Sequence, residues 1–460
     1  MNKKPNVIFL LTDQLRAMSL PRYGNPPIET PNIDRLASEG MRFTNSISTC
    51  PVCTPYRSMM LTGRHPQSTG HIMNFVNTRH DEISIADTLK DEGYQTAWVG
   101  KWHLHRGSFP NIGGRDFVPE GRDRLGFDYW RGYNFHMDYF NGSVNLDDWD
   151  CENWDGYETD ALNQYAVKFI EQADSDKPFC LFVSPHQPHF TPGDFAPEKY
   201  YEKLPKTLSL PANVSKDGKH YEQHLSDYRH YLAMILAVDD MLGELLDYLD
   251  EKGLSDDTIF IFSADHGTQM GAHEHWAFAK KLPYEESIHT PLIVRYPNVL
   301  PAGSVCDELV APVDIFPTLC SLLDVDAPAT IEGHDLTPAL LNQQIVQDAV
   351  LTMNFTASHD YIANGAEWRG VRTKTHTYTT WLNGRIELFD IVNDPQQLNN
   401  LAGKDTVREL EHNLNETLQK LMTNIGDELV PCETYRDWFD EQRRVVKNVH
   451  GTLPHPETDV

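Results

Sequence analysis

Short apolar runs alternate with amphipathic segments along the first two thirds of the chain. Residues 7–11, 94–99, 258–262 and 291–295 are β-branched or aromatic runs of strand length. Between two of these runs, apolar side chains recur at helical spacing until Gly253: Leu232, Ile235, Leu236, Leu242, Leu245, Leu246 and Leu249. The alternation predicts an α/β fold with a large, mostly parallel central sheet flanked by helices.

Helix-end signals indicate two more helices. Residues 30–40 carry Thr30 at the expected N-cap, Pro31 at the first helical position and Gly40 at the stop. Ser84 opens a further amphipathic segment that leads into the strand predicted over residues 94–99. Both segments lie along the chain where crossover helices of a parallel sheet are expected.

Between about residues 106 and 160 this alternation is lost, and Gly, Pro, Asp and aromatic residues dominate. The rings are Phe127, Tyr129, Trp130, Tyr133, Phe135, Tyr139, Phe140, Trp149 and Trp154. The segment is typical of an insertion over a sheet edge. Its rings could pack against a sugar face, or they could seal irregular loops onto the core, and both interpretations stay open.

The last third of the chain predicts a smaller unit. Residues 372–381 and 385–389 have the pattern of strands, and residues 407–422 have that of a helix. We expect a smaller antiparallel α+β subdomain here, followed by a charged tail that wraps the surface or is mobile. The expected divisions are a main, catalytic domain over residues 1–348, a C-terminal subdomain over 349–430 and a tail over 431–460.

Composition fits a folded globular protein, since the 460 residues are 40% hydrophobic and 23% charged. The formal net charge of -28 argues against nucleic-acid binding and against adhesion to anionic membranes, because repulsion opposes both. Residues 7–11 are too short for a membrane span, and no secretory cleavage pattern follows them. The expected location is periplasmic or secreted if a signal peptide has been removed, and cytoplasmic otherwise.

Seven cysteines are too few and too scattered for a disulfide scaffold. Cys50 and Cys53 form a Cys-x-x-Cys pair, which raises a redox or zinc interpretation. No second pair follows at zinc-ribbon spacing, and a redox site would not need Arg57, so this interpretation is disfavoured. Cys180 lies in an apolar run and is expected to be a buried core thiol.

Polar side chains directly follow several predicted strands. In chain order they are Asp13 and Gln14, Lys101 and His103, His186, and Asp265 and His266. Because ligands of open α/β sheets bind at the carboxyl ends of strands, we expect these side chains to converge on one crevice.

Four of these residues have the chemistry of a metal site. Asp13, Gln14, Asp265 and His266 offer two carboxylates, an amide oxygen and an imidazole to one divalent cation. Oxygen-rich ligation favours a hard ion such as Ca²⁺ or Mg²⁺, and the imidazole leaves room for Mn²⁺. We expect one divalent cation, with Ca²⁺ as the first choice.

The pentapeptide Cys53-Thr54-Pro55-Tyr56-Arg57, followed by Thr62-Gly63-Arg64, resembles the signature of type I sulfatases, whose cysteine is oxidised to formylglycine. Further blocks resemble that family in the same order: residues 5–9 before Asp13, then 100–104, 184–186, 263–267, 284–287, 291–295 and 388–401. The resemblance spans residues 5 to about 402 and implies the fold of the alkaline phosphatase superfamily.

The resemblance also implies roles. Cys53, converted by a formylglycine-generating enzyme and hydrated, would lie on the metal and present a hydroxyl to sulfur. Arg57 would pin the hydrate, and Lys101 and Lys280 would hold the sulfonate oxygens. His103 would take the proton of the second hydroxyl, so that sulfate is expelled and the aldehyde is restored.

The leaving alcohol needs an acid, for which the resemblance implies Lys280 or His186. His189 is a rival of His186, and Lys281 is a rival of Lys280. The family pattern favours His186 and Lys280.

Two departures from the family pattern keep the function open. Many sulfatases carry Asp-Asp and Asp-Asn where this chain has Asp13-Gln14 and Asp265-His266. The variant also resembles phosphonate monoester hydrolases, choline sulfatases and some polysaccharide sulfatases. We expect hydrolysis of a sulfate ester, with a carbohydrate substrate. The alternatives are phosphonate monoester or phosphodiester hydrolysis, and a non-catalytic sugar-binding relative in which Cys53 stays a thiol.

Overall fold

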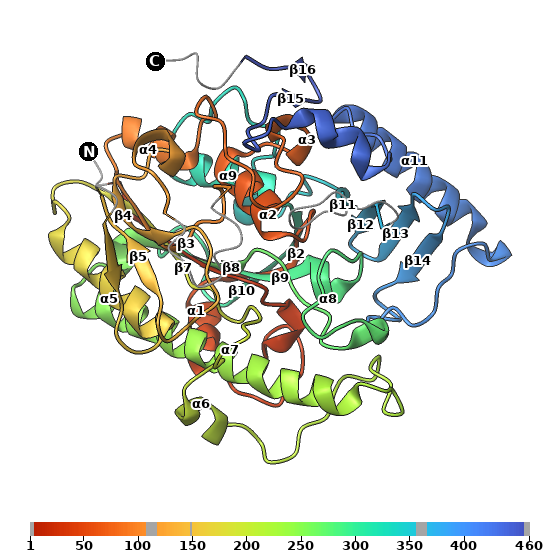
Figure 1. Ribbon diagram of the computed structural model, residues 1–460, viewed down its shortest axis with the longest axis horizontal. Coiled ribbons are helices and arrows are strands. Elements are labelled where there is room, and N and C mark those ends of the chain that lie inside the picture. The colour runs from red at the N-terminus through yellow and green to blue at the C-terminus, as the bar shows by residue number, and fades with distance from the viewer. Residues whose placement is uncertain (1–3, 107–116, 148–149, 356–365, 455–460) are drawn as a thin grey trace.

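The computed structural model describes residues 4–106, 117–147, 150–355 and 366–454. A central sheet of ten strands crosses the molecule (Figure 1). In sheet order the strands are β10 (Ser304–Val310), β2 (Met41–Ile47), β9 (His289–Arg295), β8 (Thr258–Ala264), β1 (Asn6–Thr12), β7 (Phe179–Ser184), β3 (Gln95–Lys101), β4 (Tyr129–Tyr133), β5 (Ser143–Asn145) and β6 (Cys151–Asn153).

The middle of this sheet is parallel from β8 through β1, β7 and β3 to β4. Strand β9 runs antiparallel to both of its neighbours, and β5 and β6 form an antiparallel edge. Strands β1, β7 and β8 are buried at every position, as strands covered on both faces are. The predicted α/β class with a mostly parallel sheet is confirmed.

Helices cover both faces of the sheet (Figure 1). One face carries α1 (Pro31–Glu39), α5 (Glu158–Gln172) and α7 (Tyr221–Glu251), and the other carries α2 (Cys53–Thr62), α4 (Ile85–Asp91) and α9 (Pro312–Leu322). The shorter helices are α3 (Pro66–Thr69), α6 (Glu198–Glu202), α8 (Glu285–Ile288) and α10 (Thr337–Asn342). Short 3₁₀ turns cover Ala17–Ser19, Gly121–Arg124, Ser255–Asp257, Ala272–Glu274, Asp405–Val407 and Cys432–Trp438.

Helix α1 begins where expected but is capped differently. Thr30 occupies the N-cap position, yet its side chain makes no capping hydrogen bond. Instead, Asp239 of α7 accepts the backbone N–H groups of Asn32 and Ile33 at 3.1 and 2.8 Å. A carboxylate from another helix therefore satisfies the free N–H groups that the sequence pattern assigns to Thr30.

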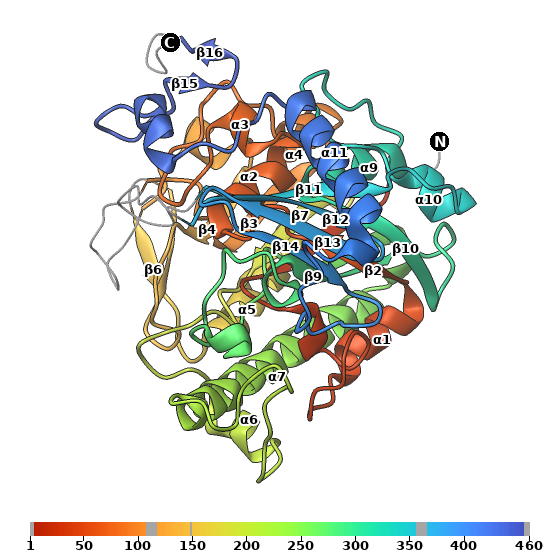
Figure 2. The ribbon, with the colours of Figure 1, turned by 90° about the vertical axis from the view of Figure 1, so that its right-hand side faces the viewer.

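The C-terminal unit is an antiparallel sheet of β11 (Ala349–Asn354), β12 (Trp368–Thr373), β13 (His376–Trp381) and β14 (Ile386–Asp390). Figure 2 shows α11 (Arg408–Asn424) lying along this sheet. The single strand expected over residues 372–381 is wrong, because the Thr373 hydroxyl accepts the N–H groups of Thr375 and His376 and turns the chain there.

The aromatic insertion joins the central sheet instead of lying over its edge. Strand β4 pairs in parallel with β3, and β5 and β6 extend the sheet further. Most of the insertion's rings are buried in the core, including Phe127, Trp130, Tyr133, Tyr139 and Trp154. For these rings the core-sealing interpretation holds, because a buried ring cannot receive a sugar. Trp149 lies outside the described residues.

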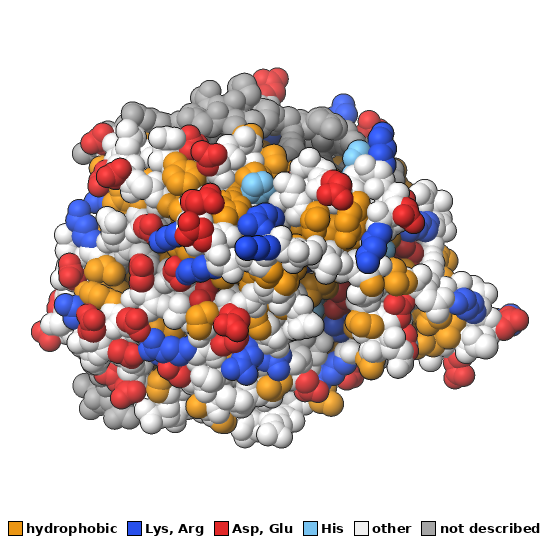
Figure 3. All heavy atoms as spheres, turned by 90° about the horizontal axis from the view of Figure 1, so that it is seen from below, with side chains coloured by type: hydrophobic (Ala, Val, Ile, Leu, Met, Phe, Trp, Pro, Cys, Tyr) orange, Lys and Arg blue, Asp and Glu red, His pale blue; other side chains and the backbone are white. Residues whose placement is uncertain are grey.

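The described part of the tail wraps the surface. It forms the small antiparallel pair β15 (Lys447–Asn448) and β16 (Gly451–Thr452), and β15 contacts α3. On the face seen in Figure 3, acidic and basic side chains are interspersed, with hydrophobic side chains scattered between them. None of the helices in the described ranges combines the length and apolar character that crossing a membrane requires.

Candidate active site

The strand-end side chains meet at one edge of the sheet, as the sequence predicts. Asp13 follows β1, Lys101 ends β3, His186 follows β7 and Asp265 follows β8. These four strands are neighbours and run in parallel, so their carboxyl ends lie side by side. Cys53, the first residue of α2, reaches the same point from the strand-to-helix loop that follows β2.

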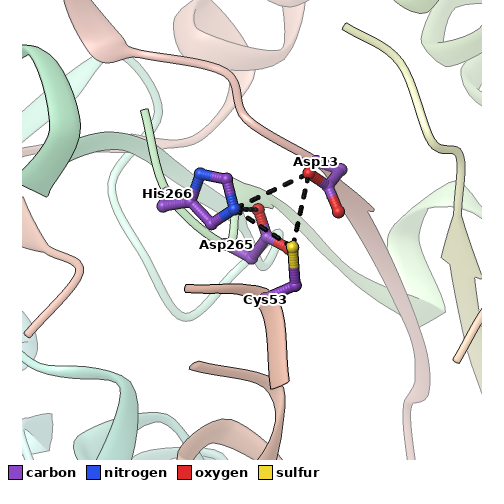
Figure 4. Close-up of side chains that lie close together, drawn as sticks. All are labelled: Asp13, Cys53, Asp265 and His266. Atoms are coloured by element: carbon purple, nitrogen blue, oxygen red, sulfur yellow. Dashed lines mark hydrogen bonds and ion pairs between the residues drawn. The ribbon is translucent and has the colours of Figure 1, made fainter. Parts of the chain in front are cut away.

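Four buried residues form a compact cluster (Figure 4): Asp13, Cys53, Asp265 and His266, whose ligand atoms all lie within 4.8 Å of one another. The Nε2 atom of His266 lies 3.3 Å from Cys53 Sγ and 3.7 Å from Asp13 Oδ1. Because His266 Nδ1 contacts the Gly267 carbonyl at 2.9 Å, Nδ1 carries the proton and the Nε2 lone pair points into the cluster. This arrangement fits a metal ligand.

Gln14 adjoins the cluster through its backbone, whose N–H donates to Asp265 Oδ1 at 3.0 Å. Its Nε2 donates to the Thr268 hydroxyl at 3.0 Å and to the Phe278 carbonyl at 2.8 Å. Its Oε1 is buried and has no hydrogen-bond partner among the described residues. An orphaned buried acceptor costs free energy unless something donates or coordinates to it, so Gln14 Oε1 is available to a bound cation.

The pKa values of Asp13 and Asp265 shift in opposite directions, because the two carboxylates are buried close together among other charges. Burial raises the pKa of Asp13, but Lys101 and other cations outweigh burial and hold this pKa well below its usual value. Burial, and after it the charge of Asp13, raises the pKa of Asp265 to about 7. Two buried carboxylates this close resist being ionised together, and a divalent cation between them would relieve the repulsion.

Two cations approach the cluster from inside the fold. Lys101 Nζ lies 2.5 Å from Asp13 Oδ2 and 3.7 Å from Cys53 Sγ. Arg57, one helical turn after Cys53, places Nε 3.2 Å from Asp265 Oδ2. Arg57 also donates to the Lys101 carbonyl at 2.8 Å. All these charges are fully buried, so each depends on its partners for stability.

Lys280 and His189 lie on the less buried side of Cys53. Lys280 Nζ is 3.1 Å from Cys53 Sγ and 3.3 Å from His189 Nε2, and both side chains are half-buried. His186 is fully buried and lies 2.9 Å from Lys101 Nζ. The structure therefore brings both rival histidines to the site, each beside its own lysine.

The histidines are neutral in this setting. Burial, and then Lys101, lowers the pKa of His103 and of His186 well below its usual value. The His103 ring packs against Phe75 and Phe135 at centroid distances of 4.9 and 4.8 Å. Neither of its nitrogens has a partner within the described part of the chain. The neutral His103 imidazole has a lone pair free to accept a proton, and its lowered pKa makes it a weaker base than a free imidazole.

Glu158 is a supporting residue that sequence reasoning missed. It accepts the His186 backbone N–H at 3.1 Å and the Gln187 side-chain amide at 3.2 Å, and burial raises its pKa to about 7. It begins α5, far in sequence from every motif, so no local signal pointed to it.

The geometry defines a class of protein. A buried thiol lies at a helix N-terminus, beside three further residues that could hold a cation with it and two lysines that can hold an oxyanion. This set, at the carboxyl ends of a mostly parallel sheet, defines a hydrolase for anionic esters.

The chain belongs to the sulfatase family, since that family's profile matches residues 5–325. A second profile, "N-sulphoglucosamine sulphohydrolase, C-terminal", matches residues 273–424. The chain is thus a type I sulfatase of the alkaline phosphatase superfamily and a sulfuric ester hydrolase.

Individual relatives cover nearly the whole chain. An ulvan-active sulfatase of Formosa agariphila is 36% identical, over 94% of this chain and 84% of its own length. An N-acetylglucosamine-6-O-sulfatase of Bacteroides thetaiotaomicron is 28% identical, over 97% and 91%. The crystal structure of a putative sulfatase from Bacteroides fragilis has a TM-score of 0.82 at 28% identity, over 94% of this chain and 97% of that chain.

Proposed function

We propose that this chain hydrolyses sulfate esters of carbohydrates, with formylglycine made from Cys53 and one divalent cation as the reactive groups. The observation that carries the proposal is the surroundings of Cys53 Sγ, which has Lys280, His266 and Lys101 at 3.1, 3.3 and 3.7 Å. A carbohydrate substrate is supported by the names of the similar proteins, an ulvan-active sulfatase and an N-acetylglucosamine-6-O-sulfatase.

Asp13, Gln14, Asp265 and His266 would hold the cation, together with the modified side chain of residue 53. The orphaned Oε1 of Gln14 and the Nε2 lone pair of His266 support this set. When bound, the cation supplies a Lewis acid that stabilises negative charge on oxygen. Three oxygen ligands and one nitrogen favour Ca²⁺, with Mg²⁺ and Mn²⁺ as alternatives.

Formylglycine supplies a geminal diol, in which one hydroxyl attacks sulfur and the other lets the aldehyde form again as sulfate leaves. Lys101 and Lys280 flank Cys53 and would bind the sulfate oxygens, whose charge grows during attack. Arg57 holds the carboxylates of Asp13 and Asp265 in place.

The reaction needs two proton transfers, and residues on different sides of the site would carry them. His103, neutral and unpartnered, would take the proton of the second hydroxyl. The leaving alcohol must depart toward solvent, and there Lys280 and His189 lie half-buried. We therefore assign the leaving-group proton to Lys280, with His189 beside it, and give His186 the task of orienting Lys101.

Substitution of Cys53 tests this proposal. Cys53→Ala is expected to abolish hydrolysis of 4-nitrophenyl sulfate while the circular dichroism spectrum and melting temperature stay unchanged. Cys151→Ala, on β6 and away from the cluster, is the matched control and should keep full activity. Mass spectrometry of the peptide containing residue 53 should show the aldehyde in active preparations. A thiol at every molecule of an active preparation would refute the mechanism.

A substrate panel separates the competing reactions. Gln14 and His266 replace an Asp and an Asn that many sulfatases carry, which is the observation that favours phosphorus substrates as a second candidate. We expect kcat/KM for an aryl sulfate and for sulfated oligosaccharides to exceed kcat/KM for an aryl phosphodiester and an aryl phosphonate. The reverse order would make the chain a phosphonate or phosphodiester hydrolase. Inactive protein that binds sulfated sugars and keeps residue 53 as a thiol would favour the non-catalytic sugar-binding relative.

A further inference from the structure

Trp276 is an exposed aromatic residue that lies close in sequence to residues of the candidate active site. Its side chain is 53% exposed, and it is the sole aromatic residue among the large exposed hydrophobic side chains of the described residues. It lies between His266 and Lys280, both of which contact Cys53 Sγ. An exposed indole offers a large flat apolar face and a polar N–H, which suit it to stack on a ligand.

The backbone around Trp276 is tied to the proposed metal site. The Trp276 carbonyl accepts the Ala279 N–H at 2.9 Å, and the Ala277 carbonyl accepts the Thr268 hydroxyl at 2.7 Å. The next carbonyl, of Phe278, accepts the side-chain amide of Gln14 at 2.8 Å. The indole is therefore held at a fixed position relative to the cluster.

Rings continue from Trp276 away from the site. The Trp276 ring lies 5.2 Å from Phe190 and 5.7 Å from the buried Phe278, both at steep angles. Phe190 lies 5.9 Å from Phe195, which stacks on His230 at 4.4 Å. We call Trp276, Phe190, Phe195 and His230 the ring ridge. Phe190 follows His189, so the ridge starts beside the proposed leaving-group side.

The far end of the ring ridge borders a surface groove of about 740 Å³. Its lining includes Phe140, Asp194, Phe195, Tyr201, Arg229 and His230. The lining combines rings with carboxylate, guanidinium and phenol groups, and this mixture matches a pyranose, which has apolar C–H faces and a rim of hydroxyls.

We propose that the ring ridge and this groove bind the sugar units adjacent to the sulfated one, so that the preferred substrate is an oligosaccharide and not a sulfated monosaccharide. The inference rests on the proposed function and adds the binding surface for the leaving side of the substrate. Trp276 would stack on the first neighbouring sugar, and the groove would take the next. Acidic Asp194 and Glu198 in the groove favour hydroxyl-rich units over further sulfate groups there.

The test compares chain lengths in the full-length, formylglycine-containing enzyme. Ulvan oligosaccharides of two, four and six sugar units and 4-nitrophenyl sulfate are assayed with wild type, Trp276→Ala and Trp276→Phe. Wild type is expected to prefer the longer oligosaccharides by about tenfold in kcat/KM, mainly through KM, which is the size of effect that one stacked ring gives. Trp276→Ala should remove most of this preference, and Trp276→Phe should restore part of it.

The matched control is Val305→Ala. Val305 is an equally exposed apolar residue on edge strand β10, and its substitution should leave the length preference unchanged.

Each outcome bears on one of the two proposals. Equal kcat/KM for all lengths, or a preference that survives Trp276→Ala, overturns the ring ridge and leaves the sulfatase mechanism standing. Turnover of the aryl sulfate without turnover of any oligosaccharide also overturns it. Absence of turnover of every sulfate ester, with the aldehyde present, refutes the proposed function itself.

Discussion

At the scale of single residues, the backbone conformation of Gln14 helps to position its side-chain amide. Its φ of 69° lies in the left-handed region, which non-glycine residues rarely adopt and which costs free energy. This conformation directs its N–H to Asp265 Oδ1 at 3.0 Å, while two bonds from Nε2 fix the amide so that Oε1 stays unpaired. Gln14 thus combines a strained backbone with an unpaired buried acceptor, and coordination of a cation by Oε1 would offset the free-energy cost of both.

Removal of this amide should weaken cation binding. For Gln14→Ala, we expect the affinity of chelator-treated protein for Ca²⁺ or Mn²⁺ to fall by about 10-fold or more, judged from what ligand-shell changes cost at other sites. Isothermal titration with each ion measures this directly. Gln67→Ala removes another buried glutamine with an unpaired Oε1, outside the cluster, and should leave the affinity unchanged. An unaltered affinity in Gln14→Ala would remove this residue from the ligand set.

At the scale of elements, the sequence predicted the apolar strands at the centre of the main sheet and missed two polar strands at its edge. β1, β7 and β8 are continuous apolar runs, so their carboxyl ends, and with them the site, could be located. β2 and β10 contain many polar residues because one lies near the edge and the other forms it, and neither was predicted. Their stability comes from neighbouring strands, which a local pattern does not record.

The same distinction applies to the site. Strand ends and family motifs predicted that Asp13, Lys101 and Asp265 lie together. In the structure Lys101 pairs with Asp13, and the carboxylates of Asp13 and Asp265 lie within 4.8 Å of each other. The sequence did not predict Glu158 or the ring ridge, because packing between segments that are distant in the chain brings them to the site. For the rings of the aromatic insertion the sequence left two interpretations open, because composition cannot tell a ring on a surface from a ring in a core.

A buried ion pair joins two elements of the C-terminal unit. Arg369 of β12 pairs with Asp427, just beyond α11, through two nitrogens, and Arg369 is fully buried. Arg369→Ala would leave the carboxylate buried without its partner, so we expect a loss of about 3–5 kcal/mol in the free energy of unfolding. Urea titration followed by circular dichroism measures it. Arg408→Ala, which removes an exposed pair with Asp405, should leave the midpoint unchanged. A similarly small effect at Arg369 would show that packing alone holds α11.

At the scale of the whole molecule, the C-terminal segments are bonded to residues that precede them in the chain. Arg372 of the small sheet forms a two-pronged pair with Glu285, at 2.9 and 3.1 Å, and donates to Asn45 of β2 at 3.2 Å. The tail is anchored by Arg79, which donates to the carbonyls of Val445 and Pro454 at 3.0 Å each. Sheet and tail therefore brace the loops around the site.

The tail's contacts lead to His103, the proposed proton acceptor. The Asn77 N–H donates to the Arg443 carbonyl, and two residues earlier Phe75 packs on His103 at 4.9 Å. Deletion of residues 432–460 should therefore lower the melting temperature and also reduce kcat for 4-nitrophenyl sulfate by about 10-fold or more, because small displacements of catalytic groups are costly. Arg79→Ala, which keeps the tail but cuts its main anchor, should shift both quantities in the same direction. If the deletion lowers only the melting temperature and kcat is preserved, the tail stabilises the fold without positioning His103.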